Sequence, residues 1–234
     1  MKLNLKKYSP IIAAIAVILI PVFPVTAQGR PQSVILNVPY VMQAPFGEWS
    51  DRRQQYGCEE AAIVMAMAWV REATNSPTDI IFKDEALRDI VNMSEYERVI
   101  YGFYEDTSAQ DTARVMREFY RYEDVVVREH IGIEDIKQEL AKNRVVLLPL
   151  NTRATGMAVY RDGPVRHMVI AVGYDDKNDE IIVHDPLFRN GEYLWIPSSR
   201  LSVALWNYTS GNLLPLPTRT TAMISVGKGD MYMK

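Results

Sequence analysis

The chain contains a single cysteine, Cys58, in the stretch RQQYGCEEAAIVMAMAW that runs from Arg53 to Trp69. A thiol becomes a nucleophile when it is ionised and when a base lies beside it. Cys58 stands at the start of a helical pattern, where free backbone N–H groups and the helix dipole favour the thiolate. We therefore expect a reactive thiol of lowered pKa. The alternative is an inert, buried thiol that packs as a small apolar side chain.

The residues beside Cys58 have simple structural explanations. Gly57 lets the backbone turn tightly just before the cysteine. Glu59 and Glu60 are acidic side chains of the kind that stabilise the first turn of a helix. Because their negative charge opposes ionisation of the thiol, we assign them no catalytic role.

A cysteine nucleophile needs a base, and the chain has three histidines. His130 lies in VREHIG between a predicted strand and a predicted helix, and is interpreted as a surface residue. In IIVHDP the alternation of a strand places His184 on the face opposite Val183 and Asp185. His167 opens a strand directly after the loop RDGPVR, where a side chain can reach into a cleft. The sequence therefore favours His167 as the base.

Asp185 is the candidate for orienting that base. The stretches His167–Asp175 and Glu180–Asp185 predict an antiparallel hairpin. With its loop centred near Asn178, the numbers of paired residues should add up to about 355 or slightly less. His167 then lies nearly level with the residues just past Asp185, within reach of a hydrogen bond between carboxylate and imidazole.

Three stretches carry a family resemblance: VPYVMQAPFGEWSDRRQQYGCEEAAIVMAMAW, PVRHMVIAVGYDDKNDEIIVHDP and NGEYLWIPSSRL. They span about Val34 to Tyr208 and resemble the C39-like cysteine peptidase family in sequence and in order. The resemblance implies a papain-like α+β fold, with a helical lobe that carries the cysteine and an antiparallel β lobe that carries histidine and aspartate. It also implies Cys58 as nucleophile, His167 as general base and acid, and Asp185 as its orienting partner.

The family also uses a glutamine upstream of the cysteine to stabilise the oxyanion. VPYVMQ resembles the segment that carries it, which implies Gln43. Gln43 precedes Cys58 by 15 positions, more than in the bacteriocin-processing members, so the nearer Gln55 is a competing candidate. Glu59 stands where members commonly have a glycine, as a variant that fits the exported, stand-alone branch.

These features predict a thiol peptidase or amidohydrolase that acts on a peptide or protein substrate. The alternatives are a peptide-binding module of the same fold without useful catalysis, and a cell-wall peptide hydrolase. No transporter segments accompany the domain, so a leader peptidase fused to an exporter is not expected. The histidines lack metal-ligand spacing, and we expect neither a metal nor a cofactor. A net charge of −3 without a basic, aromatic-interleaved stripe argues against nucleic acid as a partner.

Residues 1–27 have the pattern of a secretory signal peptide. MKLNLKKYSP supplies three lysines before the apolar run IIAAIAVILI, and PVFPVTA follows. Val25 and Ala27 fit the −3 and −1 positions of a cleavage site, which predicts a secreted or extracytoplasmic mature chain. An uncleaved membrane anchor is the alternative, although Pro21 and Pro24 disfavour a full spanning helix. In an exported protein an odd cysteine indicates a reactive thiol or an intermolecular bridge.

The elements that must position these residues follow an α+β order. Residues 28–234 are expected to form one domain, helical over about 40–122 and β-rich over about 123–226. Helices are predicted at Glu59–Glu72, Thr78–Met93, Ser108–Tyr122, Ile133–Asn143 and Ser198–Trp206. Strands are predicted at Ser33–Tyr40, Val125–Glu129, Val145–Leu150, His167–Asp175, Glu180–Pro186, Glu192–Pro197 and Thr221–Val226. Loops at Asn92–Thr107 and Asn151–Arg166 are expected to line the cleft.

Overall fold

The computed structural model of the chain describes residues 29–71, 80–211 and 218–229. The predicted signal peptide and its cleavage site lie outside these ranges. Within them, no helix combines the length and the apolar character that crossing a membrane requires.

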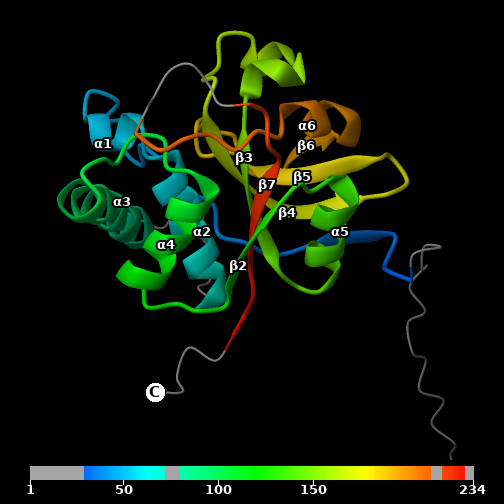
Figure 1. Cartoon of the computed structure of the whole chain (residues 1–234), viewed down its shortest axis with the longest axis horizontal. Helices are drawn as coiled ribbons and strands as arrows, with labels where there is room; N and C mark the ends of the chain where they lie inside the picture. Colours follow the sequence, from blue (N-terminus) through cyan, green and yellow to red (C-terminus); the bar gives the residue numbers. More distant parts are fainter. Residues whose placement is uncertain (1–28, 72–79, 212–217, 230–234) are drawn as a thin grey trace, which may run out of the picture.

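Four helices form one side of the molecule (Figure 1). They are α1 (Arg52–Gln55), α2 (Cys58–Val70), α3 (Ile80–Ile100) and α4 (Ala109–Phe119). Every residue of α2 is buried, because its sequence is apolar on nearly all faces. Ser108 caps α4 by accepting a hydrogen bond from the backbone N–H of Asp111.

The other side is an antiparallel sheet with the order β2-β7-β3-β4-β5-β6, and β1 also pairs with β4. Its strands are β1 (Ser33–Ile35), β2 (Val125–Glu129), β3 (Val145–Leu150), β4 (His167–Asp175), β5 (Glu180–His184), β6 (Leu194–Pro197) and β7 (Ala222–Val226). The chain therefore has the expected α+β layout.

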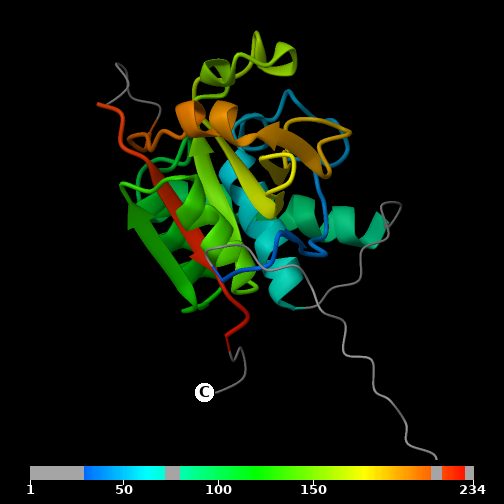
Figure 2. The ribbon, with the colours of Figure 1, turned by 90° about the vertical axis from the view of Figure 1, so that its right-hand side faces the viewer.

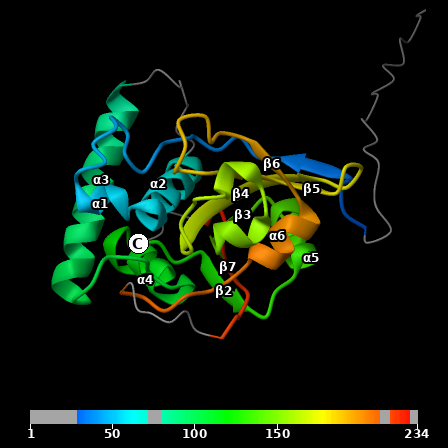
Figure 3. The same cartoon turned by 90° about the horizontal axis from the view of Figure 1, so that it is seen from above.

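The sheet is packed between two sets of helices. Seen from above, α2 and α4 lie on one side of it, and α5 (Ile133–Ala141) and α6 (Ser198–Ala204) on the other (Figure 3). Two short 3-10 helices, η1 (Thr152–Thr155) and η2 (Ala158–Tyr160), precede β4. In Figure 2 this segment and α6 lie at one end of the sheet. The chain enters β4 from that segment, and His167 is the strand's first residue.

The β4–β5 hairpin has the register that the sequence predicts near its turn. Tyr174 pairs with Ile181, and a bulge between Ala171 and Gly173 shifts the register farther from the turn by one residue. A side chain on Gly173 would place its Cβ 2.3 Å from the carbonyl oxygen of Val34 in β1, so only glycine fits this close contact.

Three local predictions are wrong. The helix predicted at Thr78–Met93 continues to Ile100, so the first part of the expected loop at Asn92–Thr107 is helical. The strand predicted at Ser33–Tyr40 ends at Ile35. Gly57 has an ordinary φ of −86°, and glycine is required there because a Cβ would lie 2.6 Å from the carbonyl oxygen of Arg53.

Candidate active site

Cys58 and His167 line the same pocket, which has a volume of about 360 Å³. Cys58 is the first residue of α2, and its side chain is 4% exposed. The N-terminal end of α2 packs against the start of β4, where the backbone of Met168 forms a hydrogen bond to the thiol. This contact between helix and strand brings the predicted nucleophile to the predicted base.

Asp185 directly follows β5 and holds the ring of His167. The Nε2 atom of His167 lies 2.7 Å from Oδ1 of Asp185, and both side chains are buried. Because Nε2 is engaged in this way, proton exchange with a neighbouring thiol is left to Nδ1.

The carboxylate of Asp185 is itself fixed by two further groups. The backbone N–H of Leu187 donates to Oδ1 at 2.9 Å, and the hydroxyl of Tyr160 donates to Oδ2. Burial and the charge of Asp185 raise the pKa of Tyr160, so its hydroxyl remains a donor. Tyr160 was not a sequence candidate, because the loop that carries it has no periodic pattern.

The other two histidines, His130 and His184, do not line the pocket of Cys58. His130 is exposed and adopts a φ of 55° after β2, as expected for a surface residue. His184 is buried: Nε2 donates to the carbonyl of Val38 at 2.9 Å, and Nδ1 accepts from the backbone of Tyr193 at 3.0 Å. Burial lowers the pKa of His184 to about 4, so it is neutral and stabilises the fold.

The expectation of a lowered pKa for Cys58 is wrong. Burial raises the pKa of the Cys58 thiol, and the carboxyl groups of Glu59 and Asp106 raise it further. The thiol Sγ lies 3.1 Å from Oε2 of Glu59. The Met168 N–H acts in the opposite direction, but the loss of solvent and the two acids outweigh it.

Glu59 and Glu60 are not solvated first-turn residues; both are 1% exposed. Oε1 of Glu59 accepts a hydrogen bond from the hydroxyl of Tyr208. Glu60 accepts from Ser94 at 3.0 Å and shares a hydrogen bond with Glu97, and burial raises the pKa of Glu60 to about 7. The sequence CEEAAIVMAMAW contains a signal for the burial of these two acids. A helix that is apolar on nearly all faces is buried all round, and its acidic residues are buried with it.

The opposite wall of the pocket carries a buried ion pair that the sequence did not indicate. Arg166, the residue before His167, lies 3.5 Å from Asp106. Burial raises the pKa of Asp106 to about 6, although the charge of Arg166 opposes the shift. The lining of the pocket therefore combines the acid Asp106 with two arginines, Arg153 and Arg166.

Both candidate glutamines line this pocket. Nε2 of Gln43 donates to the carbonyl oxygens of Gln54 and Gln55, at 3.1 and 2.9 Å, while its Oε1 is buried without a hydrogen-bond partner. The side chain of Gln55 is exposed. Cys58 adds a backbone N–H at the first position of α2, where helical N–H groups have no partner within the helix.

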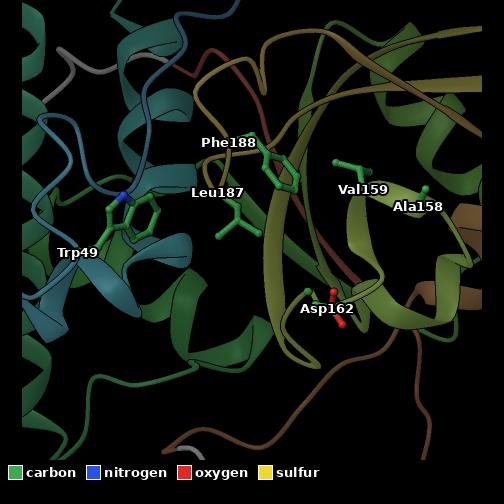
Figure 4. Close-up of a pocket in the computed structure, with 7 residues that line it drawn as sticks. Trp49, Ala158, Val159, Asp162, Leu187 and Phe188 are labelled. Carbon is green, nitrogen blue, oxygen red and sulfur yellow. The ribbon is translucent and has the colours of Figure 1, made fainter.

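An apolar hollow of about 430 Å³ adjoins the pocket (Figure 4). Trp49 reaches it from the loop before α1, Leu187 and Phe188 from the loop after β5, and Val159 from η2. A larger hollow of about 880 Å³ shares Trp49, Leu187 and Phe188 with it. Leu187 also lines the pocket of Cys58, so the three hollows meet at one residue.

No group of three or more His, Cys, Asp or Glu residues suited to a metal ion occurs in the part of the chain that the structure describes.

A helical lobe with a cysteine at a helix start, facing an antiparallel lobe with histidine and aspartate, is the arrangement of papain-like cysteine peptidases. The family model of the Peptidase_C39 like family matches residues 35–213, and the chain belongs to this family. This agrees with the resemblance seen in the sequence.

The solved structures that are similar to the chain include the following two. One is described as a C39-like peptidase from Bacillus anthracis, with 14% identity and a TM-score of 0.49 over 83% of this chain and 97% of that one. The other is xylellain, a cysteine protease from Xylella fastidiosa, with 15% identity and a TM-score of 0.43 over 94% and 95%. The search of curated proteins gave no match.

Proposed function

We propose that this protein is an exported thiol peptidase or amidohydrolase that cleaves an amide bond of a peptide or protein with Cys58, His167 and Asp185. The observation that supports this most is the shared pocket. Cys58 and His167 line it together, and the 2.7 Å contact from Asp185 fixes the ring of His167.

The reaction is acyl transfer through a thioester. Cys58 attacks the carbonyl carbon as a thiolate, while the Cys58 N–H and a glutamine side chain stabilise the oxyanion. Protonated His167 gives its proton to the leaving nitrogen as the C–N bond breaks. His167 then takes a proton from water, which attacks the thioester and releases the acid and the thiol.

The test is hydrolysis of a peptide library by the wild type and three variants. We expect Cys58→Ala to abolish new N-termini and His167→Ala to lower the rate by several orders of magnitude, as in other triads. His130→Ala is the matched control, because His130 is exposed and does not line the pocket, and it should retain full activity. Undiminished hydrolysis by a folded Cys58→Ala protein would rule the proposal out.

A peptide-binding module without useful catalysis is the second candidate, and the contact between Cys58 and Glu59 favours it. A thiol that stays neutral against a carboxylate is a poor nucleophile. Rapid, stoichiometric labelling of Cys58 by iodoacetamide at mildly acidic pH would count against the binding module. Slow labelling, at the rate of an ordinary free thiol, would support it.

Export rests on the pattern of residues 1–27. Cleavage after Ala27 would remove three lysines and leave 23 basic against 29 acidic residues, a net charge of −6. N-terminal sequencing of the protein recovered outside the cytoplasm should begin at Gln28. A full-length chain in the membrane fraction would instead indicate an uncleaved anchor.

A further inference from the structure

The carboxyl group of Glu59 is in direct contact with the nucleophile. Its Oε2 lies 3.1 Å from Sγ of Cys58, and its Oε1 accepts a hydrogen bond from Tyr208. All three residues are buried. A thiolate and a carboxylate cannot both be anionic at this distance without solvent, so one proton must lie between the two side chains.

The surroundings of Glu59 are mainly acidic. The titratable groups that face it are Cys58 and Glu60 on α2, Glu97 on α3, Asp106 before α4, and Tyr208 after α6. Arg166, a cation that lines the pocket, lies 3.5 Å from Asp106. Burial raises the pKa of Glu59 well above its usual range, and Asp106 and Glu60 raise it further, against the hydrogen bonds from Tyr208 and Cys58.

We propose that Glu59 is a positioning residue that sets the protonation state of Cys58: as a carboxylic acid it donates a hydrogen bond to the thiolate, and as a carboxylate it accepts a hydrogen bond from the neutral thiol. The step moves one proton from Sγ to Oε2 and changes no other bond or the total charge. The activated site holds a second proton on His167. Cys58 and His167 then form a thiolate–imidazolium pair. This inference rests on the proposed function, because it describes how the same nucleophile is activated.

The consequence is a window of reactivity at acidic to neutral pH. While Glu59 carries its proton, the thiolate has a hydrogen-bond donor at Oε2 and the backbone N–H of Met168 as a second one. As the pH rises, Glu59 loses its proton to solvent and a negative charge appears beside Sγ. The proton of the His167 imidazolium then passes to Sγ, so the thiolate is lost and His167 becomes neutral. Helix-dipole activation alone would instead give reactivity that increases with pH.

The test is the rate of alkylation of Cys58 by iodoacetamide from about pH 5 to about pH 8.5, followed by mass spectrometry of the peptide that contains Cys58. Glu59→Gln keeps the size of the side chain and supplies a permanent N–H donor. We expect the wild-type rate to fall as the pH rises, and the Glu59→Gln rate near pH 8 to be at least about tenfold higher than the wild-type rate. Near pH 5 the two rates should agree within a few-fold.

Two more variants separate a positioning role from simple packing. Tyr208→Phe removes the hydrogen bond that favours the ionised form of Glu59. The decline in the rate of Cys58 alkylation should therefore occur at higher pH in Tyr208→Phe than in the wild type. In the Glu59→Gln background the same substitution should leave the profile unchanged. Glu95→Gln on α3 removes an equal charge from the surface, and should reproduce the wild-type profile.

The outcomes distinguish this inference from the proposed function. Identical profiles for the wild type and Glu59→Gln would overturn the role of Glu59 while leaving an activated thiol in place. If Glu59→Gln does not fold, Tyr208→Phe provides the test. An alkylation rate of Cys58 that declines at the same pH in Tyr208→Phe as in the wild type would also overturn the role of Glu59. A wild-type Cys58 that reacts no faster than a free thiol at any pH contradicts both the inference and the peptidase itself, because the measurement needs no substrate.

Discussion

At the scale of single residues, the proposed reaction depends on which donors can reach an oxyanion beside Cys58. Gln43 lies in the pocket wall with both amide protons engaged by the carbonyls of Gln54 and Gln55. Its backbone N–H also donates to the carbonyl of Pro186, next to Asp185. Gln43 is therefore held firmly between the two lobes, and an oxyanion would have to replace one of the carbonyls as its acceptor.

We expect Gln43→Ala to lower kcat by about 10²–10³, the usual cost of one oxyanion donor. Gln55→Ala should remain within a few-fold of the wild type, because the side chain of Gln55 is exposed and a water molecule can replace it. Steady-state kinetics on one peptide substrate, with thermal melting as a check on folding, measure both. The reverse pattern, with the large loss in Gln55→Ala, would assign the role to Gln55.

Residue-level prediction from the sequence succeeded where strand geometry carries the information. The hairpin register places Asp185 beside His167, because antiparallel pairing converts residue numbers into distance. The pKa of Cys58 was mispredicted, because a helix dipole can be read from a sequence but burial and facing acids cannot. Tyr160 and Arg166 were missed for the same reason: tertiary contacts alone give them their roles.

At the scale of elements, the loops around the cysteine pocket define where a substrate can lie. The loop after β5 presents Leu187 and Phe188, and its first residue, Asp185, orients His167. Phe188 contacts the ring of Tyr160, whose hydroxyl holds Asp185. The apolar hollow is therefore built on the same residues that fix the base, so a side chain bound there lies next to the reacting groups.

We expect Trp49→Ala to lower kcat/KM for peptides with a large apolar side chain near the cleaved amide. Trp49 lines both hollows and is 37% exposed, and loss of such a wall costs about 1–3 kcal/mol, or roughly 10–200-fold. Peptides with glycine at that position should change little. Trp195→Ala, which removes a comparably exposed tryptophan from β6, is the control. An equal loss for both kinds of peptide would show that the hollow does not select the side chain.

Element boundaries were predictable where a pattern ended clearly. The strands Val125–Glu129, Val145–Leu150 and His167–Asp175 have the predicted bounds, since apolar runs there are flanked by turn residues. The helix α3 runs seven residues past the predicted Met93, because polar residues on one face of a helix resemble a loop in sequence. The two 3-10 helices before β4 have no sequence pattern, and they were predicted only as a loop.

At the scale of the whole molecule, buried acids make folding depend on pH. Burial raises the pKa of Glu60 from 4.5 to about 7, and burial and the charge of Glu60 raise that of Glu97. The folded state therefore binds more protons than the unfolded state in this interval, and stability decreases as the pH rises from about 4.5 through 7. Carboxylates held in salt bridges have the opposite effect, because they make the folded protein more stable as the pH rises.

We expect the free energy of unfolding, measured with urea, to be higher near pH 5 than near pH 8. Each unit by which a buried carboxyl pKa is raised contributes about 1.4 kcal/mol to this difference. Glu60→Gln should reduce the difference, because it removes one of the buried carboxyl groups whose pKa is raised. Equal stability at both pH values, or a difference unchanged in Glu60→Gln, would show that these acids are not protonated in the folded protein.

The overall α+β layout followed from the order of patterns along the chain, helices first and antiparallel strands after. The contact between the helical half and the sheet could not be predicted from this order. Contact between the start of α2 and the start of β4 joins residues more than a hundred positions apart, and no local pattern specifies it. The family resemblance supplied that information in the sequence analysis.

The proposed mechanism requires a thioester on Cys58, and detection of this species tests the proposal most directly. A rapid acid quench during turnover of an activated ester, followed by mass spectrometry, locates any acyl group on the chain. We expect one acyl group on Cys58 in the wild type, slower acylation in His167→Ala, and none in Cys58→Ala. Turnover that continues in Cys58→Ala, with no acyl group on Cys58 of the wild type, would contradict the mechanism.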